Sequence, residues 1–362
     1  MQVSSKLNFH SLQLSCTDRY SKELSLPDYI YTDDGMLDRE ATLSLLQREE
    51  YGFVELEGIE VSYATVFEKE DQIVGLCKHR TVEVTLKKGA LCASFPFNLY
   101  LPYGVEAPIS VVHLNFDPFI PNRYCPLEEL MERGINVAHL CYKEVSSDDG
   151  DFTDGIAPLV CDRARPDGAG KIAIWSYAAS LVADYLLANG YTTEERLFVA
   201  GHSRLGKTSL FTAARDTRFA GVLVNNSGSC GAAIAREKTG ETLERICRRF
   251  PFWFCPTFPQ YSDREEEMPF DQHYLMALVA PRRVCVVTAE KDTWADTDAQ
   301  YLCAEAASVI WHKHGLTGLN QADGFLPMGQ NDLKGTIGFS KRLGTHYLSR
   351  WDWKFFLDFL GV

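Results

Sequence analysis

Apolar runs typical of β-strands alternate with helical segments over most of the sequence beyond residue 108. The apolar runs occupy residues 109–116, 136–142, 196–201, 221–226 and 282–290. The helical patterns occupy 126–134, 173–190 and the segment that follows residue 203. Continuously apolar strands separated by helices predict a mainly parallel central sheet with helices on both faces, which is the α/β class.

The N-terminal part of the chain has a different pattern. Residues 38–50 carry apolar side chains at helical spacing, whereas residues 53–103 alternate in short runs separated by polar turns. Such alternation predicts antiparallel strands that lead into the parallel sheet. We expect one domain over residues 1–362, with residues 1–50 forming a helical extension packed on it.

Composition and charge exclude several classes of protein. The formal net charge is −13 and no run of Lys and Arg stands out, so we expect no nucleic-acid partner. No stretch approaches the ~20 uninterrupted apolar residues that cross a bilayer, so we expect no membrane partner. The sequence gives no indication of an oligomeric state.

The N-terminus and the cysteines predict a cytoplasmic location. The first thirty residues lack the pattern of a signal peptide, although a chain trimmed at its N-terminus would look the same. Eleven cysteines are scattered singly, several of them inside apolar runs. Single buried thiols of this kind indicate a reducing compartment.

The sharpest local signal is RLFVAGHSRLGKTSL at residues 196–210, where an apolar strand meets a glycine turn and a helix. One interpretation is a phosphate loop, since Gly201 to Thr208 spells G-x-x-x-x-G-K-T, with Lys207 on the phosphates and Thr208 on magnesium. Several strand–helix units precede this motif, and no acidic residue ends the run 221–226. Both features disfavour a nucleotide-binding NTPase.

The other interpretation is a nucleophile elbow, a sharp turn that exposes a serine at the end of a strand. Gly201, His202 and Ser203 match the first half of G-x-S-x-G, with the second glycine one place late at Gly206. Serine is a weak nucleophile until a base takes its proton, so the chain must also offer a histidine and an acid.

Both partners follow in the required order. Asp292 lies just past the run 282–290, with Asp296 close behind, and His346 lies after the last strand-like run. The order Ser, Asp, His is that of the α/β-hydrolase fold. We therefore predict Ser203 as nucleophile, His346 as base and Asp292 as the acid, while Asp296 stays open as an alternative acid or as a helix cap.

The predicted mechanism needs no metal and no cofactor. Ser203 attacks an ester carbonyl, His346 takes the proton, and the backbone N–H of Arg204 stabilises the oxyanion, with its guanidinium adding charge. We expect the other histidines to be structural or helix-terminal. They include His113, His202, His273, His312 and His314.

The motif Gly-His-Ser-Arg-Leu-Gly-Lys resembles the G-x-S-R-x-G-K signature of the glucuronoyl esterases, which cleave glucuronic acid esters that link xylan to lignin. The resemblance runs from about residue 26 to the C-terminus and is strongest over 196–311, including WFCPTFPQY and MPFDQHYLMALVAPRR. It implies that Lys207 and Glu241 grip the sugar acid and that Trp294 forms an aromatic wall. It also implies a small-molecule or oligosaccharide ester as substrate.

Two departures from this family matter. Many members carry the acid in a Glu-Ser-Gly step, which reads Asn226-Ser227-Gly228 here, and some bacterial members instead resemble this chain in using an aspartate at the position of Asp292. The second departure is the missing secretion signal, which weakens a polymeric substrate. Esters of acetylated xylan or small acetyl sugars are the alternative substrates, and a non-catalytic binding protein is disfavoured because every position of the triad is filled.

Overall fold

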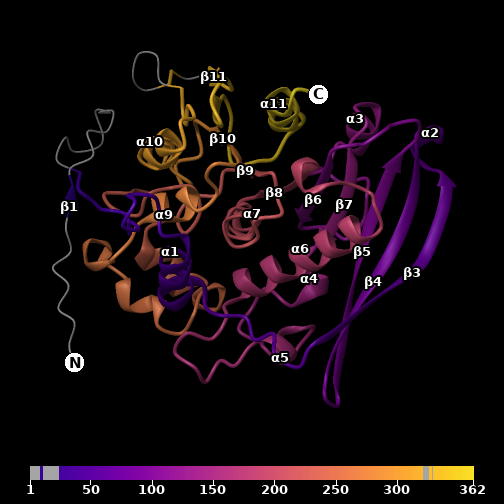
Figure 1. Ribbon diagram of the computed structural model, residues 1–362, viewed down its shortest axis with the longest axis horizontal. Coiled ribbons are helices and arrows are strands. Elements are labelled where there is room, and N and C mark those ends of the chain that lie inside the picture. The colour runs from indigo at the N-terminus through magenta and orange to yellow at the C-terminus, as the bar shows by residue number, and fades with distance from the viewer. Residues whose placement is uncertain (1–8, 11–23, 321–325, 328) are drawn as a thin grey trace.

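Ten strands form one mixed sheet in the computed structural model, which describes residues 9–10, 24–320, 326–327 and 329–362 (Figure 1). The strand order is β11-β12-β10-β9-β8-β6-β7-β5-β4-β3. In chain order these strands are β3 (Glu60–Asp71), β4 (Cys77–Lys88), β5 (Leu91–Pro102), β6 (Ser110–Asn115), β7 (Asn136–Cys141), β8 (Leu197–His202), β9 (Gly221–Asn225), β10 (Arg283–Ala289), β11 (Asn331–Asp332) and β12 (Ile337–Arg342). A separate two-stranded pairing joins β1 (Phe9–His10) to β2 (Leu26–Pro27).

The sheet divides into a parallel part and an antiparallel part, as the two sequence patterns predict. Strands β7, β6, β8, β9, β10 and β12 pair in parallel. Strands β3, β4 and β5 pair antiparallel, and β5 joins them to β7. The predicted α/β-hydrolase fold, a mainly parallel sheet entered by antiparallel strands, is confirmed.

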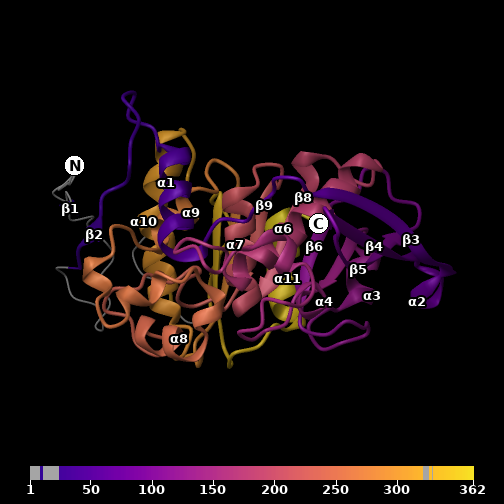
Figure 2. The ribbon, with the colours of Figure 1, turned by 90° about the horizontal axis from the view of Figure 1, so that it is seen from below.

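Helices cover both faces of the parallel strands (Figures 1 and 2). One face packs against α6 (Lys171–Ala188), α7 (Arg204–Arg215) and α10 (Thr297–Lys313), and the other against α3 (Leu127–Glu132) and α11 (Arg350–Leu360). Neighbouring residues along β6 show the alternation, since Val112 belongs to the first core and Val111 to the second. This double burial explains why the strands are apolar throughout.

The helix expected over residues 38–50 is present at residues 39–51. Helix α1 (Arg39–Leu46) continues as one π-helical segment, η1 (Gln47–Tyr51), while residues 1–8 and 11–23 of the predicted extension lie outside the described residues. The ring of Tyr51 stacks on Phe211 of α7 at 4.1 Å, and its hydroxyl donates to the carbonyl of Cys230. Tyr51, at the end of η1, is therefore packed against the helix that carries the elbow.

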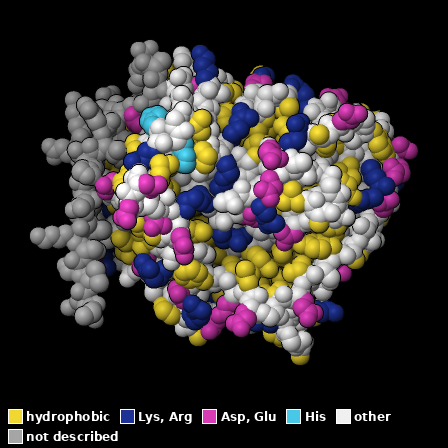
Figure 3. All heavy atoms as spheres, in the orientation of Figure 1, with side chains coloured by type: hydrophobic (Ala, Val, Ile, Leu, Met, Phe, Trp, Pro, Cys, Tyr) yellow, Lys and Arg dark blue, Asp and Glu magenta, His cyan; other side chains and the backbone are white. Residues whose placement is uncertain are grey.

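The remaining helices are short and lie in the connections. They are α2 (Gln72–Gly75), α4 (Tyr142–Val145), α5 (Ala157–Val160), α8 (Leu243–Arg249) and α9 (Gln272–Ala277), with 3₁₀ turns η2 (Glu194–Arg196), η3 (Pro251–Trp253), η4 (Phe258–Tyr261) and η5 (Glu265–Glu267). On the face drawn in Figure 3, acidic and basic side chains are interspersed among hydrophobic ones. Within the described residues, no helix combines the length and the apolar character that a membrane crossing requires.

Parallel pairing brings the carboxyl ends of β8, β9, β10 and β12 to one edge of the sheet. The segments that follow these four strands contain the predicted serine, the Asn-Ser-Gly step, the two aspartates and the histidine. Ligands of open α/β sheets bind at this edge. This edge of the sheet is therefore where we expect the active site.

Candidate active site

Ser203 occupies a strained turn between β8 and α7. Its backbone has φ 57° and ψ −126°, a positive φ that is uncommon for a residue with a side chain. The turn is also tight, because a Cβ on Gly201 would lie 2.2 Å from the carbonyl oxygen of Leu205. Strain at one residue and obligatory glycine before it are the geometry expected of a nucleophile elbow.

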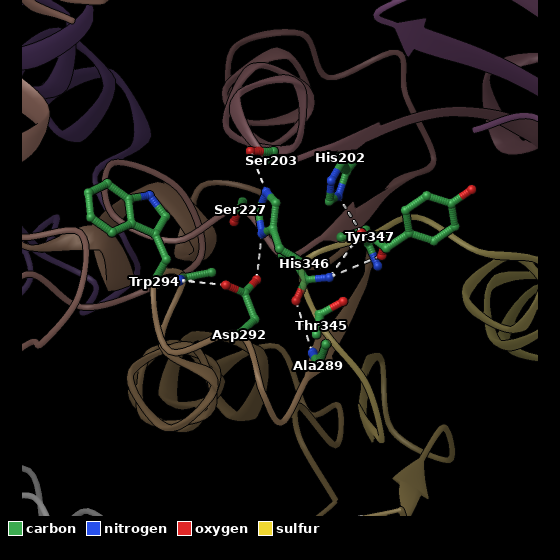
Figure 4. Close-up of polar contacts among 12 residues, drawn as sticks. His202, Ser203, Ser227, Ala289, Asp292, Trp294, Thr345, His346 and Tyr347 are labelled. Carbon is green, nitrogen blue, oxygen red and sulfur yellow. Dashed lines mark hydrogen bonds and ion pairs between the residues drawn. The ribbon is translucent and has the colours of Figure 1, made fainter. Parts of the chain in front are cut away.

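Ser203, His346 and Asp292 form one hydrogen-bonded line (Figure 4). The Nε2 atom of His346 lies 2.9 Å from the Oγ atom of Ser203, and its Nδ1 atom lies 2.6 Å from Oδ2 of Asp292. An ionised carboxylate only accepts hydrogen bonds, so Nδ1 carries the hydrogen and Nε2 of the neutral ring is free to accept the serine proton. Asp292 is 3% exposed, so solvent competes little for this contact.

The two candidate aspartates have different partners. Asp292 contacts His346 and accepts a second bond from the backbone N–H of Ala295. Asp296 is the N-cap of α10 and accepts from the backbone N–H groups of Ala299 and Thr239. The geometry therefore makes Asp292 the partner of the histidine and Asp296 a helix cap.

Asp148 and aromatic rings hold Arg204, the first residue of α7. The guanidinium contacts Oδ2 of Asp148 and lies 4.7 Å from the centre of the Trp253 ring. The same carboxylate accepts from the hydroxyl of Tyr142 and from the indole N–H of Trp253, each at 2.8 Å. This network therefore restricts one cation beside the elbow.

Lys207 is buried under the site and is 1% exposed. Its ammonium donates to the carbonyls of Ser227 and Ser229 at 2.5 and 2.6 Å and to Oε2 of Glu241 at 2.8 Å. These bonds use all three donors of the ammonium group. The phosphate-loop interpretation fails here, because its lysine must reach out toward a nucleotide and its threonine must be free. Instead, the hydroxyl of Thr208 donates to the carbonyl of Arg204.

The three residues predicted to bind a sugar lie together. Glu241 pairs with Lys207, and its backbone N–H donates to the carbonyl of Trp294 at 2.9 Å. The ammonium of Lys238 also donates to that carbonyl, so the Trp294 backbone is held from two sides. The Trp294 residue is 37% exposed and stands on the opposite side of His346 from Tyr347 (Figure 4).

Sequence reasoning missed Asp148 at this edge, and it named Asn226 only as the position where many relatives carry the acid. Asp148 lies a few residues beyond the end of β7, and Asn226 directly follows β9. Their position after parallel strands is the signal that could have found them. Asp154, which lies in the loop after Asp148, accepts from the buried ammonium of Lys171.

A serine at the turn between a parallel strand and a helix, on a sheet of this order, defines the class of α/β hydrolases. The comparison with known families is more specific. The profile described as "Glucuronyl esterase, fungi" matches residues 84–315. The chain belongs to the glucuronyl esterase family, and the resemblance inferred from the sequence is confirmed.

Individual relatives agree with this assignment. A carbohydrate esterase from an unknown prokaryotic organism is 37% identical over 237 residues, which cover 64% of this chain and 54% of that protein. A 4-O-methyl-glucuronoyl methylesterase of Podospora anserina is 24% identical over 281 residues, covering 75% of this chain and 54% of the relative. The chain thus spans about half the length of these curated relatives.

Solved structures match over more of the chain. A glucuronoyl esterase from Solibacter usitatus superimposes with a TM-score of 0.82 at 26% identity, covering 93% of this chain and 98% of the other. A glucuronoyl esterase from Teredinibacter turnerae has the same TM-score and identity, covering 93% and 88%. Members of the family are carboxylic ester hydrolases.

The expected cytoplasmic location is wrong. Glucuronoyl esterase homologues are secreted, extracellular enzymes. A thiol buried among apolar groups is inert in any compartment, so buried single cysteines do not indicate a reducing one. Across the described part of the chain the cysteines are free, and most of them are buried.

Proposed function

We propose that this chain is a serine esterase that hydrolyses glucuronoyl esters through Ser203, His346 and Asp292. The observation that carries the proposal is the continuous line of hydrogen bonds from the serine hydroxyl to the aspartate. Ser203 Oγ attacks the ester carbonyl as its proton passes to Nε2 of His346. Asp292 holds the imidazole in the required tautomer and stabilises the imidazolium that forms.

The acyl-enzyme forms and is hydrolysed by the same groups. The tetrahedral intermediate carries an oxyanion, for which the backbone N–H of Arg204 at the start of α7 is the proposed donor. The guanidinium of Arg204, restrained by Asp148, adds positive charge nearby. His346 returns its proton to the leaving alcohol, and then removes a proton from the water that attacks the acyl-enzyme.

We assign the sugar ring to the Trp294 side of His346. Trp294 presents a partly exposed aromatic face, and sugars present C–H groups that pack on such faces. Oε2 of Glu241 accepts from Lys207, whereas Oε1 has no hydrogen-bond partner among the described residues and is available to a sugar hydroxyl. In this arrangement Lys207 acts through Glu241, by holding its carboxylate in place.

We assign the alcohol to the opposite side of His346, toward Tyr347. A groove of about 730 Å³ is lined by Tyr347, the residue after His346, together with Ile120 and Trp351. The ester carbonyl would then lie at Ser203, with the acid half of the ester on the Trp294 side of His346 and the alcohol half on the Tyr347 side.

A panel of methyl and benzyl esters of glucuronic acid, compared with acetylated sugars, tests this function. We expect hydrolysis of the glucuronate esters, and loss of at least about 10⁴-fold in kcat/KM for Ser203→Ala with an unchanged circular dichroism spectrum. Activity on acetyl sugars alone would favour the second candidate substrate. That candidate has one observation behind it, since a structure at 27% identity and TM-score 0.79 is described as a promiscuous esterase from a marine bacterial metagenome. An active Ser203→Ala protein would refute the proposed nucleophile.

A further inference from the structure

Asn226 connects the end of β9 to the end of β10 and to the loop that follows β12. It directly follows β9, and its backbone has φ 45°, which asparagine tolerates better than most residues. Its side-chain oxygen accepts from the backbone N–H of Ala289 on β10 at 2.9 Å. Its amide nitrogen lies 3.4 Å from the carbonyl oxygen of Tyr347, the residue after His346. Asn226 is 1% exposed.

The amide nitrogen of Asn226 makes a second contact, which sets the state of a neighbouring histidine. The bond from the Ala289 N–H identifies the Asn226 side-chain oxygen, so its other end is the NH₂ group and donates to Oδ1 of Asn225 at 3.1 Å. Oδ1 of Asn225 is therefore an acceptor, and Nδ1 of His202, 2.5 Å away, must donate to it. His202 is thus fixed in the tautomer with hydrogen on Nδ1.

His202 lies against His346, with 4.5 Å between the ring centres. Burial, and secondly the nearby His346, lower the pKa of His202 to about 3, so that it stays neutral where His346 works. A neutral ring in one tautomer restricts His346 without adding a like charge. Asp292 and the hydroxyl of Ser203 contact His346, while the rings of Phe116 and Tyr124 pack against His202, which also lies near the buried His113. The guanidinium of Arg342 contacts the carbonyl of Tyr347.

We propose that Asn226 is a positioning residue that aligns His346 with Ser203 by hydrogen bonds to the His346 loop and, through Asn225, to His202. The inference rests on the proposed esterase function for its kinetic part only. Arg342 supports the same loop from β12, the strand that precedes it, whereas Asn226 joins the loop to β9 and β10. The role requires a side chain that accepts at one end and donates at the other, which an amide does and a carboxylate does not.

Two substitutions and one matched control test this role. Asn226→Ala removes all three bonds, while Asn226→Asp keeps the size and the acceptor but cannot donate when ionised. We expect both to lower kcat on a glucuronate ester by roughly tenfold to hundredfold, with KM changed less than about twofold, because misalignment affects the reaction more than binding. Wild-type kcat in Asn226→Asp would overturn the proposal.

Asn136→Ala is the control for a purely structural loss. Asn136 is 2% exposed and donates to Ser110 and Tyr191 at 3.1 and 2.9 Å, but it begins β7 at the opposite edge of the sheet. The Asn136→Ala variant should lower the free energy of unfolding about as much as Asn226→Ala does, but it should leave kcat unchanged. An equal fall in kcat for Asn136→Ala and Asn226→Ala would mean that Asn226 acts through stability alone.

Nitrogen-15 spectra of the histidine rings give a readout that needs no activity. In the wild type we expect His202 to remain the neutral Nδ1–H tautomer between about pH 5 and 8. In Asn226→Ala the two tautomers should mix and the His346 signals should shift, whereas Asn136→Ala should leave both unchanged. Unchanged His202 and His346 signals in Asn226→Ala would overturn the proposal. An inactive wild type with the expected spectra would refute only the esterase function.

Discussion

Buried carboxylates at the active-site edge differ from a buried carboxylate at the N-terminal junction. At the edge, Asp292 contacts a histidine ring and Glu241 contacts an ammonium group. At the junction, Glu50 of η1 is 0% exposed and accepts from the amide of Gln272 at 3.0 and 3.2 Å. Among the described residues it forms no ion pair, and its partners are neutral.

The difference shows that the partner, more than burial itself, decides what a buried acid can do. Desolvation raises the pKa of Glu50 to about 7, and the hydrogen bonds from Gln272 only partly oppose it. Glu241 is nearly as buried at 5% exposure, but Lys207 stands 2.8 Å away. The edge therefore gives its carboxylates an imidazole or an ammonium as partner, whereas the junction surrounds its carboxyl with neutral groups and the pKa of Glu50 is raised. Three variants probe this contrast.

Asp292→Asn should have the largest effect. An amide in place of the carboxylate cannot stabilise the imidazolium and can hold the ring in the wrong tautomer, so we expect kcat to fall roughly 10³- to 10⁴-fold. Steady-state kinetics on a glucuronate ester measure it. The matched control is Asp296→Asn, which keeps a good N-cap on α10 and should change kcat less than a few-fold. The reverse ranking would show that the wrong aspartate was chosen.

Lys207→Met should have the next largest effect, which is a loss in the free energy of unfolding. Methionine has nearly the same length but leaves Glu241 buried without its cation and two carbonyls without their donor. Breaking a buried pair in this way costs roughly 3–5 kcal/mol in the free energy of unfolding, measured by chemical denaturation. Adding Glu241→Gln to the same protein should recover part of this loss. If Lys207→Met alone lowers the free energy of unfolding by less than about 1 kcal/mol, the pair of Lys207 and Glu241 is not structurally important.

Glu50→Gln should have the smallest effect, and one that depends on pH. The folded-state pKa is raised, so between about pH 4.5 and 7 the unfolded chain loses a proton that the folded chain retains, and stability falls as pH rises through this window. The glutamine of the variant does not titrate. The stability of the variant relative to wild type should therefore increase by about 3 kcal/mol from about pH 4 to pH 8. Denaturation curves across this range measure it. Glu57→Gln, at an exposed turn, is the control, and an equal trend in both variants would contradict the assignment.

The site was predictable where chain order carries the information. The strand before Ser203, the strand before Asp292 and the position of His346 after the last long strand are all visible in the hydrophobic pattern. The choice between Asp292 and Asp296 was not visible, because both follow β10 within a few residues. It depends on which carboxylate faces His346, and that histidine lies 54 residues further along the chain.

Periodicity and residue type in the sequence alone determined the α/β class, the antiparallel and parallel halves of the sheet, and the elbow at Ser203. These features are local, since each depends on residues within one turn or one strand. Folding of the whole chain places Lys207 beneath the site against Glu241, brings Asp148 to Arg204, and brings Asn226 to the His346 loop. Each of these contacts joins segments far apart in the chain, and no local pattern encodes which distant partner a polar side chain will meet.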